Sequence, residues 1–297
     1  MDIHHISSLA AKTKPNQHFY TQVLGLRQVK YTVNQENPHM VHLFYGDYLG
    51  SPGTVITFFI VPFLGRRVNG NHDIYGVYLG IPTGTLSWWT TWIKSQDIEV
   101  EATKHGISFN DPDDFRITLQ EIDESLQRNQ IIPTSPVPAE NQIIKIIGTD
   151  WIGPDIAASE DFFKQYLNLN IDQNHRIEVG QNQFIQLIQS DQPDERTRFG
   201  RGSTDHLALA SPTDDDLFSA WSRAADQGWE QEVYKDRTWF KSIYLRDPSD
   251  NRLELATVTP GFTVDEPLET LGESLVLPKW LEPRRAEIED NLAHQSV

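Results

Sequence analysis

The residues best suited to chemistry in this sequence are a histidine and a glutamate on two apolar, strand-like segments. His206 lies in the run 204–210, and Glu254 follows 48 positions later in the run 252–257. A carboxylate in so apolar a strand is costly to bury unless it is paired or binds a metal. Two interpretations stay open for each residue. Glu254 is either a ligand or a surface side chain on a half-exposed strand, and His206 is either a ligand or a structural histidine.

A further pair of histidines, His4 and His5, lies on the first strand-like segment, residues 2–10. Because side chains alternate along a strand, only one of the two is expected to face a given pocket. The sequence contains no cysteine, so any metal would be bound through nitrogen and oxygen atoms. Two histidines and one carboxylate with open positions are typical of non-haem Fe(II) oxygenases, which bind an aromatic diol and O₂ side by side.

The segments that carry these residues belong to a unit of the order β-α-β-β-β, which recurs four times. In the first unit, a strand at 2–10 and a helix ending near Gly25 precede strands at 27–33, 40–48 and 53–61. The second unit has a strand at 74–82, a helix at 85–94 and strands at 99–102, 106–110 and 115–121, before a linker at 123–141. The third unit occupies 142–190, and the fourth has a strand at 204–210, a helix at 213–227 and strands at 231–234, 239–245 and 252–257.

An internal repeat supports this division. The pattern Phe-Tyr-x-x-Val-Leu-Gly-Leu at 19–26 matches Phe-Phe-x-x-Tyr-Leu-Asn-Leu at 162–169, with Asn in place of the helix-ending Gly. The same offset places Gly148 where the first unit has His5. One cup can therefore hold all three ligands only if unit one pairs with unit four. If units three and four pair instead, the site has two ligands.

Four such units resemble the vicinal-oxygen-chelate superfamily, which includes glyoxalase I, bleomycin-resistance proteins and extradiol dioxygenases. The resemblance implies an α+β fold in which four βαβββ modules form two cup-shaped barrels with a metal on the inner face of one. We expect modules 1 and 4 to pair, and modules 2 and 3 to pair. Along the chain we expect an N-terminal domain at 1–135 (modules 1 and 2), a C-terminal domain at 142–258 (modules 3 and 4) and a tail at 259–297 with a helix near 282–293.

More specifically, the sequence is similar to the ring-cleaving dioxygenases that include chlorohydroquinone and hydroquinone 1,2-dioxygenases. The stretches that carry the similarity are 4–7, 48–54, 205–208, 236–244 and 247–257, together with the tail from Phe262 to Pro278. The resemblance implies that the metal is Fe(II), with Mn(II) as the alternative. It also implies that the metal ligands are His5, His206 and Glu254. The catalytic residues that it implies are His4, Arg237 and Tyr244, and the substrate-binding residue is Ser7.

Each of these roles has a simple chemical basis. Arg237 would pair with a deprotonated diol oxygen, Tyr244 would donate a hydrogen bond to the substrate, and His4 would move a proton. Ser7 stands where the family commonly has Thr, which leaves the identity of the substrate open. Among the other histidines, only His42 on a first-unit strand is a candidate for a place in the pocket.

Composition limits the classes of partner. The chain of 297 residues has a net charge of −17, which disfavours nucleic acid and anionic lipid as partners. It has no apolar run of membrane-spanning length and no leader pattern, so we expect a cytoplasmic location. The expected partners are a small aromatic diol and O₂, and self-association into a homo-oligomer is compatible with the sequence.

The leading hypothesis is an Fe(II)-dependent extradiol-type dioxygenase that cleaves a hydroquinone- or catechol-like ring. A glyoxalase-like lyase or isomerase is the first alternative, but it needs four ligands, and the strand at 54–61 offers no glutamate to match Glu254. A metal-free protein that binds an aromatic compound or an antibiotic is the second alternative, and it predicts no ligand triad.

Overall fold

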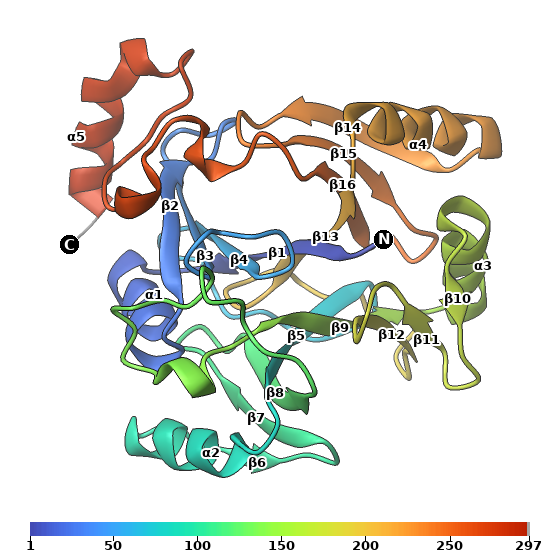
Figure 1. Cartoon of the computed structure of the whole chain (residues 1–297). Coiled ribbons are helices and arrows are strands. Elements are labelled where there is room, and N and C mark those ends of the chain that lie inside the picture. The colour runs from blue at the N-terminus through green and yellow to red at the C-terminus, as the bar shows by residue number, and fades with distance from the viewer. Residues whose placement is uncertain (296–297) are drawn as a thin grey trace.

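Two eight-stranded sheets form the framework of the computed structural model, which describes residues 1–295 (Figure 1). The first sheet contains β1 (Ile3–Ala10), β2 (Arg27–Val33), β3 (Val41–Gly46), β4 (Val55–Ile60), β13 (Thr204–Ser211), β14 (Glu230–Asp236), β15 (Lys241–Arg246) and β16 (Arg252–Thr257). The second sheet contains β5 (Asp73–Pro82), β6 (Glu101–Ala102), β7 (Gly106–Asn110), β8 (Arg116–Ile122), β9 (Lys145–Gly153), β10 (Asn170–Ile171), β11 (Arg176–Glu178) and β12 (Phe184–Gln189).

The helices lie around the outside of the two sheets (Figure 1). They are α1 (Thr13–His18), which continues as a π-helical turn, η1 (Phe19–Val23), then α2 (Leu86–Ser95), α3 (Ile156–Leu167), α4 (Asp214–Gln227) and α5 (Arg285–Gln295). Short 3₁₀ turns are η2 (Ala139–Asn141), η3 (Phe262–Val264), η4 (Leu268–Thr270) and η5 (Glu282–Arg284). No helix within residues 1–295 is long and apolar enough to cross a membrane.

The strand order confirms the α+β fold and the expected pairing of modules. In the first sheet the order is β14-β15-β16-β13-β1-β4-β3-β2, so modules 4 and 1 are joined where β13 pairs with β1. In the second sheet the order is β10-β11-β12-β9-β5-β8-β7-β6, which joins modules 3 and 2. The segments 1–135 and 142–258 therefore each contribute one module to each sheet. The expected tail, 259–297, ends two residues beyond the described part of the chain.

Left-handed residues end the helices where the sequence predicts them. Asn168 has φ of 54° after α3, and Gly25 has φ of 71° after η1. Asn tolerates this conformation, which is why it can replace Gly in the repeat. At Gly25 space is a second constraint, because an added Cβ would lie 2.4 Å from the hydroxyl oxygen of Ser135.

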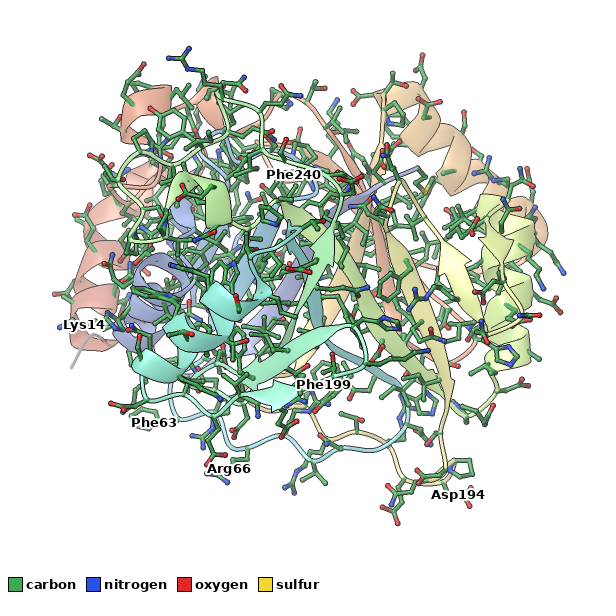
Figure 2. All side chains as sticks on the ribbon, turned by 60° about the horizontal axis from the view of Figure 1, so that its bottom comes forward. Lys14, Phe63, Arg66, Asp194, Phe199 and Phe240 are labelled. Carbon is green, nitrogen blue, oxygen red and sulfur yellow. The ribbon has the colours of Figure 1, made fainter. Side chains whose placement is uncertain are left out.

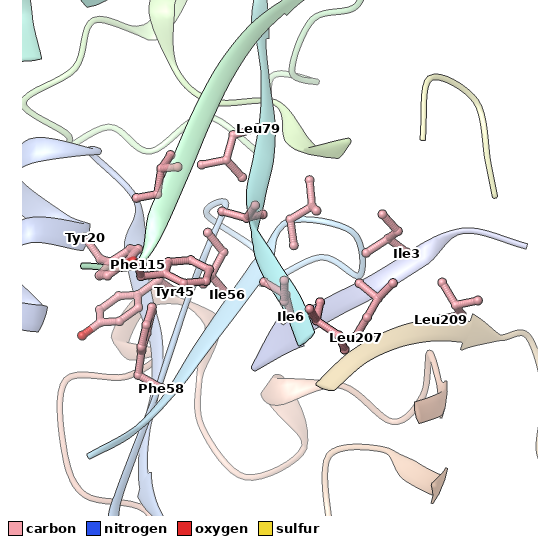
Figure 3. Packing of buried hydrophobic residues seen from close by; sticks show 14 of the residues in the cluster. Ile3, Ile6, Tyr20, Tyr45, Ile56, Phe58, Leu79, Phe115, Leu207 and Leu209 are labelled. Carbon is pink, nitrogen blue, oxygen red and sulfur yellow. The ribbon is translucent and has the colours of Figure 1, made fainter. Parts of the chain in front are cut away.

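The hydrophobic core lies on the face of the first sheet that is turned away from its cup (Figure 3). Ile6 and Leu207 are fully buried there, and Leu79 of β5 brings the second sheet into the same cluster. Burying side chains of this kind contributes about 1.5–3 kcal/mol each. Because side chains alternate on a strand, the residues between these apolar ones face the cup.

The loop 61–72 connects modules 1 and 2, and the loop 190–203 connects modules 3 and 4. The two loops run side by side and are joined by an isolated bridge between Val68 and Arg198. They lie along the lower edge in Figure 2, where Phe63 and Phe199 are exposed. The C-terminal tail packs against the first sheet at its β2 edge. There the buried ammonium of Lys30 is paired with Asp265 and Glu266, and the tail is thereby fixed beside β2.

Candidate metal centre

Three ligand atoms converge on the inner face of the first sheet. The Nε2 atoms of His5 and His206 lie 3.2 Å apart, and the Oε2 atom of Glu254 lies 3.4 Å from the former and 2.8 Å from the latter. Ligand atoms at neighbouring positions about 2.1 Å from one ion would be separated by about 3 Å. The triangle therefore has the size of three ligand positions on one side of an ion.

Burial and hydrogen bonding also fit a metal. The three side chains are between 0% and 3% exposed, and they form a group of potential ligands within residues 1–295. The Oε2 atom of Glu254 is buried and has no hydrogen-bond partner among the described residues. A buried carboxylate oxygen without a hydrogen bond costs free energy unless a cation compensates it. The donor set, two nitrogens and one oxygen, suits divalent iron or manganese.

Strand register brings the triad together. His5 on β1 is in register with Ala208 on β13, and Ala208 is in register with Glu254 on β16. The small side chain of Ala208 thus stands between the two ligands and leaves room for them. His206 lies two residues before Ala208 and faces the same side, which is the period-2 pattern that the sequence predicts.

Asp205 and Arg252 orient His206. Nδ1 of His206 donates a hydrogen bond to Oδ2 of Asp205 at 2.6 Å, and the same oxygen accepts one from Nη1 of Arg252 at 2.9 Å. Burial would raise the pKa of Asp205, but the hydrogen bond from His206 and the charge of Arg252 outweigh it and hold the pKa below its ordinary value. The carboxylate therefore stays ionised, fixes the ring and leaves Nε2 free for a metal.

His4 orients His5 through a feature that the sequence does not reveal. The pairing of β1 with β13 shifts by one residue between Ile3 and His5, so His4 is the extra residue of a bulge. Its Nδ1 atom lies 2.8 Å from Nδ1 of His5. If Nε2 of His5 faces the metal, Nδ1 of His5 donates this hydrogen bond. Burial, with the nearby His5, lowers the pKa of His4 to about 3, so its ring is neutral and can accept it.

The carboxylate of Glu254 is held ionised. Burial alone would raise its pKa, but His5 and His206 outweigh burial and lower it well below its ordinary value. Its second oxygen, Oε1, accepts a hydrogen bond of 2.5 Å from the hydroxyl of Ser242 on β15. Glu254 thus offers one anchored oxygen and one free anionic oxygen, as a monodentate metal ligand requires.

A cavity opens beside the triad, lined by His5 and His206. Four of the other residues selected from the sequence also line it, namely Ser7, His42, Arg237 and Tyr244. His4 is not among the lining residues and lies behind His5. The rest of the wall is formed by the aromatic residues Phe44, Phe59, Trp239 and Phe240, together with Val33, Asn34 and Gln35.

Arg237 and Tyr244 act as a pair at the edge of this cavity. Nη2 of Arg237 donates to the hydroxyl oxygen of Tyr244 at 3.3 Å, and Nη1 donates to both oxygens of Glu36 at 2.7 Å. Burial, with the nearby carboxylate of Glu254, raises the pKa of Tyr244. Tyr244 therefore keeps its proton, and since its oxygen accepts from Arg237, the proton is available to a molecule in the cavity.

Several residues of the site were not selected from the sequence. Asp205 and Ser242 anchor two of the ligands, and Arg252 holds Asp205. An acidic residue directly before a candidate histidine was a usable signal for Asp205. Ser242 needs the register of β15 with β16, in which Ser242 opposes Ala256, and a single sequence does not supply that register.

Among residues 1–295, the second cup has no comparable centre. Gly148 occupies the position that matches His5, and a Cβ there would lie 2.8 Å from the ring of Phe184. Tyr78 and Asp150 meet in this cup through hydrogen bonds of 3.2 and 3.3 Å. Within residues 1–295, no second group of three potential ligands accompanies them.

Comparison with known proteins agrees with this arrangement. Residues 148–255 match the family model described as "Glyoxalase/Bleomycin resistance protein/Dioxygenase superfamily". The chain is 32% identical to "Putative ring-cleaving dioxygenase MhqA" of Bacillus subtilis over 98% of this chain and 97% of that protein. The chain belongs to this ring-cleaving dioxygenase family.

Two further similarities cover nearly the whole chain. The chlorohydroquinone/hydroquinone 1,2-dioxygenase of Sphingobium indicum is 29% identical over 96% of this chain and 94% of its own. A crystal structure described as a "putative dioxygenase" from B. subtilis superimposes with a TM-score of 0.91 at 28% identity, over 98% of this chain and 96% of that one. Family membership confirms the resemblance inferred from the sequence and supports dioxygenase activity.

Proposed function

We propose that the protein is an Fe(II)-dependent, extradiol-type ring-cleaving dioxygenase that inserts O₂ into a hydroquinone- or catechol-like aromatic diol. The observation that carries the proposal is the buried triangle of His5, His206 and Glu254, which opens onto an aromatic-lined cavity. An iron ion bound there would supply Lewis acidity toward the diol and redox chemistry toward O₂. Mn(II) would fit the same donor set.

The chain's own residues bind and orient the substrate in this proposal. Arg237 is a fixed cation, so it stabilises the negative charge of a deprotonated diol oxygen. Tyr244 donates a hydrogen bond to an oxygen of the bound diol, because it retains its proton in this environment. The hydroxyl of Ser7, 2.8 Å from that of Thr57, lines the cavity and would contact the bound diol.

The role proposed for His4 is to orient His5. It contacts His5 and the ring of Phe240, whose centroid is 5.2 Å away, and it does not line the cavity. Proton transfer by His4, as the family resemblance implies, stays a prediction. A proton that leaves the diol would reach His4 only by way of His5 or a water molecule.

The decisive experiment is anaerobic reconstitution with Fe(II), followed by oxygen-electrode measurements with hydroquinone, methylhydroquinone and catechol. We expect one O₂ consumed for each diol cleaved, with loss of the aromatic absorbance. Iron-loaded protein that consumes no O₂ with any of these diols would refute the proposal. Zn(II) and Ni(II) loading with a hemithioacetal substrate is the matching test for lyase activity, for which we expect none.

A further inference from the structure

His42 is the third histidine among the described residues that line the cavity, and the metal centre does not use it. It lies on β3, with its ring between those of Phe44 and Phe59, each 4.1 Å away between centroids. It is stacked on Phe59 and tilted against Phe44, and these two contacts hold the imidazole plane in one orientation. Burial, followed by the positive charge of Arg237, lowers the pKa of His42 well below its ordinary value, so the ring is neutral.

One ring nitrogen of His42, Nε2, forms a hydrogen bond with another side chain, and the other, Nδ1, forms none among residues 1–295. Nε2 is 2.9 Å from the hydroxyl of Thr57, which in turn is 2.8 Å from the hydroxyl of Ser7. Since Thr57 has one hydroxyl proton, it donates to one neighbour and accepts from the other, and this choice sets the tautomer of His42. Nδ1 of His42 has no hydrogen-bond partner among residues 1–295.

His42 stands well apart from the triad on the same face. Ser7 is in register with Thr57 of β4, while His42 is in register with Phe59. β3 is the second strand from β1, so the backbones are separated by roughly 10 Å across the sheet. The unpartnered Nδ1 is thus a polar atom in a mainly aromatic wall, at a distance from the metal ligands.

We propose that His42 is a specificity-determining residue whose Nδ1 forms a hydrogen bond with the substrate hydroxyl farther from the metal centre. This inference rests on the proposed function. A para-diol has its oxygens at opposite ends of the ring, so one faces the triad and Arg237 while the other faces His42. An ortho-diol would place both oxygens at the triad and a C–H group against His42, which would shield Nδ1 from water without giving it a hydrogen bond, at a cost in free energy.

The test compares hydroquinone with phenol, which lacks the far hydroxyl, as ligands of the Fe(II)-loaded protein under anaerobic conditions. In His42→Phe the ring still fits between Phe44 and Phe59, but both nitrogens are lost. We expect the ratio of hydroquinone affinity to phenol affinity to fall roughly three- to tenfold, the effect of one hydrogen bond. The affinity for phenol itself should not fall, whereas a general distortion of the cavity would lower it.

Two more variants separate the nitrogens. His42→Asn keeps a polar atom at the δ position and should restore part of the ratio, whereas His42→Gln keeps only the ε position and should behave like His42→Phe. His105→Phe, an exposed histidine near the second sheet, is the matched control. Far-ultraviolet circular dichroism and iron content establish that each variant is folded and loaded. An unchanged ratio in both folded His42→Phe and His42→Gln would overturn the assignment.

The outcome is independent of the test of the proposed function. If no diol supports O₂ uptake by the unaltered protein, the proposed function fails, while the binding ratio still reports on His42. If uptake occurs, the ratio of kcat/KM for hydroquinone to kcat/KM for catechol should fall in His42→Phe relative to the unaltered protein. A selective loss of catechol turnover would contradict the inference even where the activity itself is established.

Discussion

Glu254 is the residue on which the metal centre depends most, because it supplies the only negative charge of the triad. Its free oxygen has two histidine nitrogens nearby and no other partner among residues 1–295. In Glu254→Ala the two imidazoles remain, but two neutral ligands hold a divalent ion weakly. We expect bound iron to fall from near one equivalent to background and O₂ uptake to disappear, with the circular-dichroism spectrum retained.

The control for this variant is Glu230→Ala, which removes an exposed carboxylate from β14, separated from β16 by β15. It should keep its iron and its activity, as measured by metal analysis after gel filtration. Stoichiometric iron in Glu254→Ala would refute the assignment of Glu254 as a ligand.

Asp205 acts through His206, and its removal should therefore weaken the site without abolishing it. In Asp205→Asn the amide oxygen can still accept the hydrogen bond from Nδ1 of His206, but the acceptor is no longer charged. The imidazole ring is therefore held less firmly and is a poorer metal ligand. Partners of this kind typically contribute about 10- to 100-fold to metal affinity. Competition with a fluorescent chelator measures the change. Asp191→Asn on an exposed loop should leave the affinity unchanged, and equal affinities in both variants would exclude the orienting role.

At the scale of elements, β13 makes room for the metal ligands because it places the small side chain of Ala208 between them. Ala208 is fully buried between His5 and Glu254 in the register of β1, β13 and β16. In Ala208→Val two added methyl groups would enter the space of the ligands, at a cost of about 1–3 kcal/mol in stability and with the triad forced apart. We expect loss of bound iron in a protein that remains folded.

Ala210→Val provides the comparison, because Ala210 lies farther along the same face of β13 and is not among the residues that line the cavity. This variant should retain its iron. Metal content and thermal unfolding measured on both proteins separate the two effects. Retained iron in a folded Ala208→Val protein would show that the register of β13 does not constrain the ligands.

At the scale of the whole molecule, the internal repeat and the alternation of side chains along strands are what made the pairing of modules predictable from the sequence. The absence of a histidine at Gly148 and its presence at His5 pointed to the pairing of modules 1 and 4, which the sheet order confirms. Helix ends at Gly25 and Asn168 were predictable because few residues tolerate a positive φ.

What the sequence could not supply depends on neighbouring strands. The bulge at His4 exists only relative to β13, and strict alternation would have turned His4 away from His5. The contact of Ser242 with Glu254 depends on the register of β15 and β16. Such relations arise from tertiary packing, which overrides what a single strand dictates.

The contact between modules 1 and 2 makes the stability of the whole molecule depend on pH. The buried carboxyl of Asp111, between β7 and β8, accepts a hydrogen bond of 3.1 Å from the hydroxyl of Tyr20, with Asp113 nearby. Burial raises the pKa of Asp111 to about 7, well above its ordinary value of 3.8. The folded state therefore binds this proton more tightly than the unfolded state, and the stabilisation present below about pH 4 is lost as the pH rises through 7.

We expect the free energy of unfolding, measured in urea at pH 5, 6, 7 and 8, to contain a component that falls by at most about 1.4 kcal/mol per pH unit, the limit for one proton. In Asp111→Asn, which keeps the hydrogen-bonding shape but cannot ionise, this component should vanish. The stability of the variant relative to that of the unaltered protein should then increase from pH 5 to pH 7.

The control is Asp226→Asn, on the exposed side of α4, whose difference in stability from the unaltered protein should be the same at each pH. Parallel pH curves for Asp111→Asn and the unaltered protein would mean that Asp111 is ionised throughout, and that the contact between modules 1 and 2 is indifferent to its charge.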